Sequence, residues 1–153
     1  MVYTTSLDVE DYVILQNTED YAFSQDSVFL ANTAKIDKND RVLDLGCGSG
    51  ILATLALVKK HAALAVGIEL QPDVADMARQ SAKINRLDDK LTIVDGDVKD
   101  IKNLVKAESF DVVLCNPPYF QGEQNTKKNL SRSESTATLA DFVYAASYAL
   151  RFG

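Results

Sequence analysis

The residues whose types most directly suggest chemistry are four in a row: Asn116, Pro117, Pro118 and Tyr119. Two successive prolines fix the backbone φ angles and remove two N–H donors, so the turn is stiff and rich in hydrogen-bond acceptors. The Asn116 side-chain oxygen and the Pro117 carbonyl can both accept hydrogen bonds from one NH2 group, and Tyr119 can lie against the flat face of the same molecule. We therefore treat these residues as a candidate catalytic set; the alternative is a rigid turn without chemistry.

Such a turn suits methyl transfer to a planar amine. The lone pair of an amide or aryl amine is delocalised, so the nitrogen is a poor nucleophile. Two acceptors orient the NH2 group and stabilise the positive charge that develops on nitrogen. A sulfonium is already a good leaving group, so the remaining requirement is alignment rather than a strong base. The chain's single histidine, His61, is accordingly expected at the surface rather than in the site.

A glycine-rich turn, Gly46-Cys-Gly48-Ser-Gly50, lies between an expected strand and an expected helix. Glycines at this place allow positive φ angles and close approach of a ligand to the backbone. Glu69 ends the next strand, where its carboxylate can accept hydrogen bonds from ribose hydroxyls, and Asp97 can accept one from an adenine amino group. Asp44, just before the turn, could engage the charged amino-acid end of a ligand. These positions predict a pocket for an adenosine-containing molecule.

A dinucleotide site would have a similar appearance. Its GxGxxG pattern requires glycine at position 51, which here is Ile51. An NAD-dependent oxidoreductase stays open as an alternative, although nothing in the sequence positions a hydride acceptor. A tight turn that binds no ligand is the other alternative.

Short apolar strands alternate with amphipathic helices, which predicts an α/β fold with a parallel sheet. The expected strands are 12–16, 41–45, 64–70, 91–94 and 110–115, and the expected helices are 26–34, 51–59, 98–105 and two that begin near Pro72 and Thr138. In the last helix, Thr138 and Asp141 resemble a capping box. The expected apolar face of that helix comprises Leu139, Phe142, Val143, Ala146 and Leu150.

The fourth strand of the expected parallel sheet is apolar without alternation from Val112 to Cys115. Such a run is typical of a strand that is covered on both faces. Right-handed crossovers between successive strands give the order 3-2-1-4, which leaves the outer edge of the fourth strand unpaired. We therefore expect self-association, or low stability, through this exposed edge.

Composition places limits on function. The chain of 153 residues is long enough for a single domain, and no apolar run is long enough for a membrane span. The polar, acidic start predicts no secretory signal, so we expect a cytoplasmic location without membrane partners. The spacing of Cys47 and Cys115 suggests neither a disulfide scaffold nor a zinc site, and we expect no bound metal.

The net charge of −6 argues mildly against a large nucleic-acid footprint, because phosphate binding needs a basic surface. A local patch is still compatible with an acidic body. Lys127, Lys128 and Arg132 follow the double proline among polar residues and could contact phosphates near a target base. The alternative is an ordinary solvated loop.

Taken together, these motifs resemble class I S-adenosylmethionine-dependent methyltransferases that modify nitrogen. The resemblance is closest to the bacterial tRNA (adenine-N6)-methyltransferases that act on an adenine beside the anticodon of a valine tRNA. The residues that carry it are Phe23–Leu30, Val42–Ile51, Val66–Leu70, Cys115–Phe120, Ala75–Ala78, Asn85, Arg132 and Glu134.

The resemblance implies specific roles and a specific fold. The methionine end of the cofactor would contact Asp44, Gly46, Gly48 and Gly50, its ribose Glu69, and its adenine Asp97 and Val98. Leu70 and Asn116 would also bind the cofactor, and Asn116, Pro117, Pro118 and Tyr119 would hold the target amine beside it. The fold would be a Rossmann-like methyltransferase domain spanning residues 1–153, partial because strands 5–7 of that fold are lacking. Residues 1–37 would form an N-terminal cofactor-side segment and residues 38–153 the core.

The function implied is transfer of a methyl group to N6 of an anticodon-loop adenine, with tRNA as the partner. Glutamine N5 methylation of a release factor uses the same Asn-Pro-Pro-Tyr chemistry and stays open. So does a truncated remnant that binds cofactor or RNA without catalysis. DNA adenine methylation is disfavoured, because no target-recognition domain is evident.

Overall fold

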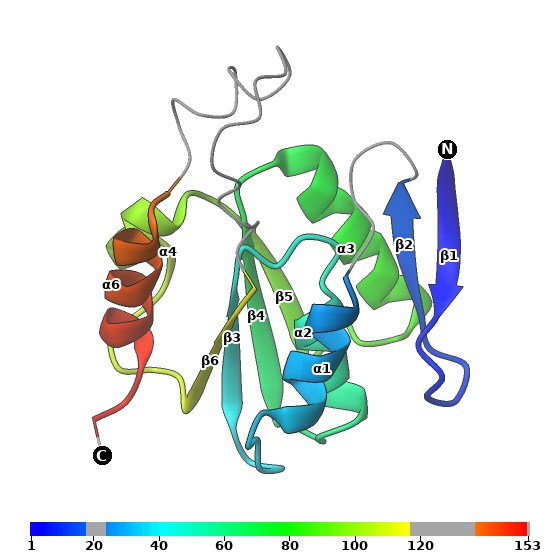
Figure 1. Ribbon diagram of the computed structural model, residues 1–153, viewed down its shortest axis with the longest axis horizontal. Coiled ribbons are helices and arrows are strands. Elements are labelled where there is room, and N and C mark those ends of the chain that lie inside the picture. The colour runs from blue at the N-terminus through cyan, green and yellow to red at the C-terminus, as the bar shows by residue number, and fades with distance from the viewer. Residues whose placement is uncertain (18–23, 117–136, 153) are drawn as a thin grey trace.

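The computed structural model describes residues 1–17, 24–116 and 137–152 (Figure 1). Its strands are β1 (Val2–Ser6), β2 (Val13–Asn17), β3 (Arg41–Leu45), β4 (Leu64–Glu69), β5 (Leu91–Asp95) and β6 (Val112–Cys115). Its helices are α1 (Gln25–Thr33), α2 (Ile51–Val58), α3 (Pro72–Ile84), the 3-10 turn η1 (Val98–Asp100), α4 (Ile101–Leu104) and α6 (Leu139–Ala149). The elements expected from the sequence are thus present, with ends displaced by a few residues.

The central sheet has four parallel strands in the order β5-β4-β3-β6. This is the 3-2-1-4 order that right-handed crossovers predict, so the predicted topology is confirmed. In the register, Leu45 of β3 lies opposite both Ile68 of β4 and Cys115 of β6. The carboxyl ends of the three strands therefore meet at one edge, where parallel α/β sheets bind their ligands.

Helices cover both faces of the sheet (Figure 1). Helices α1, α2 and α3 lie on one side of the sheet, and η1, α4 and α6 lie on the other. Each of these two groups packs on one hydrophobic cluster. Along β6, Val112 and Leu114 pack into the first cluster while Val113 and Cys115 pack into the second. The prediction that this strand is covered on both faces is confirmed.

An antiparallel hairpin of β1 and β2 lies beside α3. Strand β2 was expected, but β1 was missed, because its residues are mostly exposed and form no buried alternation. Asn85, the C-cap residue of α3, hydrogen-bonds to the backbone of β2 through its side-chain amide. Its Oδ1 accepts from Val13 N at 2.9 Å and its Nδ2 donates to Val13 O at 2.7 Å. Ser81 Oγ accepts from Leu15 N at 2.9 Å, so the hairpin is tied to α3 by polar contacts.

The capping box of α6 is confirmed, since Thr138 N donates to Asp141 Oδ2 at 2.7 Å and Asp141 N donates to Thr138 Oγ1 at 3.3 Å. The expected apolar face is partly wrong. Leu139 and Val143 are 62% and 61% exposed, and the buried side chains of this helix are Phe142, Ala145 and Ala149. The buried residues Phe142, Ala145 and Ala149 also have helical spacing, so the spacing of apolar residues alone could not distinguish this face from the predicted one.

Leu150 follows α6 and forms an isolated parallel bridge with Phe110. Arg151 extends this contact, because its N–H donates to Phe110 O at 2.9 Å and its guanidinium pairs with Asp111 at 2.7 Å. The chain after α6 therefore returns to the start of β6. Within the described ranges no strand pairs with the outer edge of β6 itself, and self-association through that edge stays a prediction. No described helix is long and apolar enough to cross a membrane.

Candidate active site

The glycine turn connects β3 to α2 and has the backbone shape that was predicted. Gly46, Gly48 and Gly50 have φ angles of +70°, +55° and +82°, values that side chains disfavour. The turn is tied to the sheet, because Cys47 N donates to Ile68 O at 2.9 Å. Gly50 N donates to Cys47 O at 2.8 Å and closes the turn.

Space around Gly48 is open: a Cβ added there would meet no atom within 4 Å. A ligand could therefore approach this backbone directly. The opposite holds at Gly67 of β4, where a Cβ would lie 2.7 Å from Cys47 Sγ. Gly67 was not predicted from the sequence as a contact site, although a glycine inside a strand often marks close approach of another chain segment.

Replacing Gly67 by alanine should destabilise the protein by about 1–3 kcal/mol, because the added methyl group overpacks a rigid contact. It would also lie 2.9 Å from Ile93 Cδ1, so no single side-chain movement relieves it. Urea unfolding measures the change. Cys47→Ala in the same background should recover part of the loss, and an unaltered midpoint in Gly67→Ala alone would contradict the close packing.

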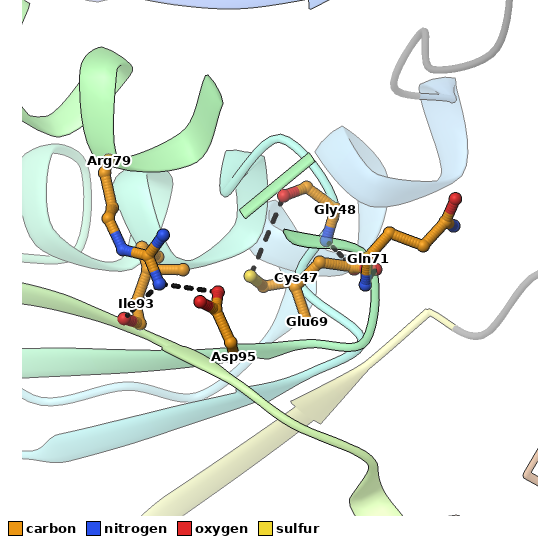
Figure 2. A network of polar contacts seen from close by, with 7 residues as sticks. All are labelled: Cys47, Gly48, Glu69, Gln71, Arg79, Ile93 and Asp95. Carbon is orange, nitrogen blue, oxygen red and sulfur yellow. Dashed lines mark hydrogen bonds and ion pairs between the residues drawn. The ribbon is translucent and has the colours of Figure 1, made fainter. Parts of the chain in front are cut away.

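Glu69 ends β4 and links the glycine turn to the loop that follows (Figure 2). Its Oε2 accepts from Gly48 N at 2.9 Å and its Oε1 accepts from Gln71 N at 3.0 Å. Each oxygen has acceptor capacity beyond one such bond. The carboxylate is therefore held beside the turn, where ribose recognition was predicted, and it keeps unused hydrogen-bond acceptor capacity.

Asp44 of β3 is fully buried beneath the turn. Its Oδ2 accepts from Ala53 N at 3.3 Å, at the start of α2, while no described residue supplies a partner for Oδ1. Burial, and to a lesser extent the charge of Glu69, raises the pKa of the Asp44 carboxyl to about 7. A buried carboxyl with an unpaired oxygen is unfavourable in the free protein, and a cationic hydrogen-bond donor would supply the missing partner.

The remaining predicted cofactor residues flank this centre. Asp97 caps η1, where its Oδ1 accepts from Lys99 N at 2.9 Å and its Oδ2 lies 3.3 Å from Lys99 Nζ. The Val98 side chain is buried in the cluster under α6, and Leu70 is 44% exposed just past β4. Val98 therefore offers a ligand its backbone rather than its side chain.

Arg79 of α3 was not identified from the sequence. Its Nη2 donates to Asp95 Oδ1 at 2.6 Å and to Ile93 O at 3.2 Å, at the end of β5 (Figure 2). The contact fixes α3 over the edge of the sheet next to Glu69. Nothing in the spacing of Arg79 and Asp95 signals this pair, because it depends on how α3 crosses β5.

Asn116 directly follows β6 and is half-buried. Its Nδ2 donates to Ser27 Oγ at 2.8 Å and to Ser24 Oγ at 3.3 Å, both at the start of α1. By resemblance, residues 23–27, which include both serines, were expected on the cofactor side, but their contact with Asn116 was not predicted from the sequence. The other predicted residues of this part, Pro117, Pro118, Tyr119, Lys127, Lys128, Arg132 and Phe23, lie outside the described residues.

The two cysteines were expected to be small packing residues. Cys47 is buried and Cys115 half-buried, and both are free thiols. Burial raises the pKa of Cys115 to about 12 and that of Cys47 well above its usual value. Both therefore stay protonated at neutral pH and are poor nucleophiles.

The charge at this edge of the sheet is negative. Glu69 and Asp97 lie at or just past the carboxyl ends of the strands, and Asp44, with a pKa of about 7, adds its charge when it ionises. The burial of Asp44 and Glu69 strengthens their effect on a nearby ligand. Such a site favours a ligand with positive charge over one with several phosphates. No group of three or more metal-binding side chains is found in the part of the chain that the structure describes.

A parallel sheet of this order, a glycine turn after β3 and a carboxylate at the end of β4 define a Rossmann-like domain. The chain belongs to the family described as Methyltransferase small domain, which matches residues 20–140.

Curated relatives are similar over most of this chain. A tRNA1(Val) (adenine(37)-N6)-methyltransferase of Shewanella amazonensis is 34% identical over 117 residues, covering 76% of this chain and 49% of that protein. One of the same name from Porphyromonas gingivalis is 30% identical over 110 residues, covering 69% and 43%. The chain thus spans about half the length of the curated relatives it matches.

Solved structures agree in fold. Pyrococcus horikoshii TYW2, solved with MeSAdo, superposes with a TM-score of 0.73 at 15% identity, covering 99% of this chain and 49% of that one. A SAM-dependent methyltransferase of Thiobacillus denitrificans, solved with S-adenosyl-L-homocysteine, gives 0.59 at 22% identity over 84% and 45%. The predicted Rossmann-like methyltransferase fold is confirmed.

Proposed function

We propose that this chain binds S-adenosylmethionine at the carboxyl edge of β3 and β4 and transfers its methyl group to N6 of an adenine in a valine tRNA. The observation that carries the proposal is the place of Asn116. It follows β6, which pairs with β3, so an amide oxygen stands one strand away from the glycine turn. Relatives named for this reaction support the choice of substrate.

The residues present fit this cofactor. The open backbone at Gly48 gives room for close approach, and Glu69 can accept hydrogen bonds from ribose hydroxyls. The buried Asp44 with its unsatisfied oxygen suits an ammonium group or the donors around it. A nicotinamide dinucleotide would instead bring phosphates to an edge rich in carboxylates, which disfavours the oxidoreductase alternative.

When bound, S-adenosylmethionine supplies a methyl group on a positively charged sulfur. Asp44, Gly48 and Glu69 would hold the cofactor, and its methyl group would pass to the lone pair of the target nitrogen, with the carbon–sulfur electron pair staying on sulfur and the nitrogen proton going to solvent. Asn116 Oδ1 accepts a hydrogen bond from the NH2 group and stabilises its growing positive charge. The Pro117 carbonyl would be the second acceptor and Tyr119 the stacking surface.

An adenine in an anticodon loop is a feasible target, because an unpaired base can rotate out of its stack into a pocket at a small cost in free energy. Lys127, Lys128 and Arg132 would contact phosphates beside it. Glutamine N5 methylation needs the same acceptors around an NH2 group, so the site chemistry alone admits both substrates. The similarity to tRNA-modifying relatives favours adenine.

Methyl-labelled S-adenosylmethionine offered with total tRNA, a release factor or duplex DNA separates these substrates. We expect label in tRNA at N6 of adenine, identified after nuclease digestion. Label only in the release factor would show that the release factor, rather than tRNA, is the substrate. Label in DNA alone would exclude both tRNA and the release factor. Cofactor binding by calorimetry without any labelling would favour a non-catalytic remnant.

Cofactor affinity should rise with pH. Free Asp44 has a pKa of about 7, and a cation bound nearby favours the ionised carboxylate, so binding releases a proton when it begins from the protonated form. Below pH 7 the affinity is expected to fall by up to about tenfold per pH unit. Calorimetry at pH 6, 7 and 8 measures this slope.

The amino group of the cofactor also titrates, so Asp44→Asn is the control: it should remove the part of the slope that belongs to the protein. Equal slopes in the two proteins would show that Asp44 does not take part in the linkage.

A further inference from the structure

We infer that Ser24 and Ser27 are positioning residues that fix the side-chain amide of Asn116, so that the site presents only an acceptor to its substrate. The inference rests on the proposed function for its catalytic meaning. The contact itself can be tested without catalysis. It joins the start of α1 to the end of β6, segments 89 and 92 residues apart in the chain.

The geometry uses the whole donor capacity of the amide. An asparagine NH2 group has two protons, and here it has two acceptors, Ser27 Oγ at 2.8 Å and Ser24 Oγ at 3.3 Å. No donor among the described residues reaches Oδ1 of Asn116. With both protons engaged on the α1 side, the oxygen is the polar atom that the side chain can offer elsewhere.

Ser24 makes this contact in place of its ordinary one. It is the N-cap of α1, a position where a serine hydroxyl usually accepts from a backbone N–H and stabilises the helix by about 1 kcal/mol. Its side chain forms no such cap bond, and Ser27 N donates to the Ser24 backbone oxygen instead. The hydroxyl is thus available to Asn116 at the expense of the helix.

Ser27 is the stronger of the two anchors. It is 5% exposed, so its hydroxyl is largely withdrawn from water, and its bond to Asn116 is the shorter. A buried hydroxyl without a partner is unfavourable, which holds serine and asparagine together. A free amide can rotate by half a turn and present NH2 instead of oxygen. Here both hydroxyls accept from Nδ2, so the amide is held with its oxygen facing away from them.

The orientation determines which groups can be methylated. An outward Oδ1 binds a donor such as the NH2 of adenine or of a carboxamide, and it repels a carbonyl oxygen. An outward NH2 would do the reverse. The two serines therefore act on substrate choice and on alignment without touching the substrate.

The contact is tested by nuclear magnetic resonance on the whole chain. The Asn116 side-chain amide pair is identified by its loss in Asn116→Asp. In Ser27→Ala we expect this pair to shift towards values of a solvent-exposed asparagine and to exchange with water at least about tenfold faster. Ser81→Ala is the matched control, since it removes another buried serine hydrogen bond, to Leu15 N, on α3. An Asn116 pair that behaves alike in wild type, Ser27→Ala and Ser81→Ala would overturn the inference, whether or not the chain methylates anything.

The kinetic consequence is measured in single turnovers with the substrate that wild type labels. Ser27→Ala should slow methyl transfer by about 10–100-fold, as misplacement of a reacting group does, with cofactor affinity unchanged. Ser27→Thr, which keeps the hydroxyl, should restore most of the rate, and Ser81→Ala should leave it unchanged. A similar rate loss in Ser81→Ala, or none in Ser27→Ala, would refute the positioning role. If wild type labels no substrate, the proposed function fails while the resonance test still decides the contact.

Discussion

Asn116→Ala is expected to lower the rate of methyl transfer by about 10²–10³-fold while cofactor affinity stays the same. The amide oxygen is the proposed acceptor for the target NH2, and loss of one preorganised hydrogen bond to a developing charge typically has an effect of this size. Asn116 follows β6 and contacts α1, whereas the predicted cofactor residues belong to the ends of β3, β4 and β5. Single-turnover labelling of tRNA and calorimetry with S-adenosylhomocysteine measure the two quantities separately.

Asn103→Ala, at an exposed position on α4, is the control and should leave both quantities unchanged. Thermal unfolding of both variants tests whether they are folded. Labelling that persists in a folded Asn116→Ala protein would refute the role of this residue. Loss of cofactor binding along with labelling would instead assign Asn116 to the cofactor pocket.

The fold could be predicted largely because its signals are local. The alternation of apolar strands with helices, the glycine turn and Pro72 at the start of α3 each depend on a few neighbouring residues, and handedness then determined the strand order. The boundaries of β3 were predicted without error for the same reason. Strand β1 was missed because it is mostly exposed and, among the strands that the structure describes, pairs with β2 alone.

The site was predicted less completely, because its supporting contacts join distant segments. Glycines with positive φ could be foreseen from the turn, but the partnership of Arg79 with Asp95 depends on how α3 crosses the sheet. The contact of Ser27 with Asn116 likewise arises only once α1 is placed beside β6. Side chains that bind a ligand carry a sequence pattern; the residues that hold them in place do not.

Asp44→Asn should weaken cofactor binding and yet stabilise the free protein at alkaline pH. In wild type the folded pKa of about 7 lies above the ordinary value of 3.8. Between these values the unfolded chain loses the Asp44 proton while the folded chain retains it, so stability falls as pH rises and levels off above pH 7. A shift of about three pKa units corresponds to about 4 kcal/mol.

Asparagine carries no charge, so the variant lacks this penalty. It can keep the bond from Ala53 N through its oxygen, but its NH2 group gains the unsatisfied environment of Oδ1, which reduces the net gain to about 2 kcal/mol. At roughly 2–4 °C per kcal/mol for a chain of this size, the melting temperature at pH 8 should rise by several degrees. Near pH 3 the gain should disappear, because Asp44 is then protonated in the folded protein and largely so in the unfolded one.

The same substitution removes the carboxylate that a cationic ligand would face, so cofactor affinity at pH 8 should fall by about 10²-fold, as expected for a buried charge-assisted contact of about 3 kcal/mol. Asp89→Asn, an exposed carboxylate, is the control and should alter neither quantity. A melting difference that does not vary with pH would contradict the raised pKa. Stability that rises without loss of affinity would separate Asp44 from the cofactor. Opposite changes in stability and affinity would indicate that Asp44 is kept for ligand binding at the expense of folding, a relation found at many binding sites.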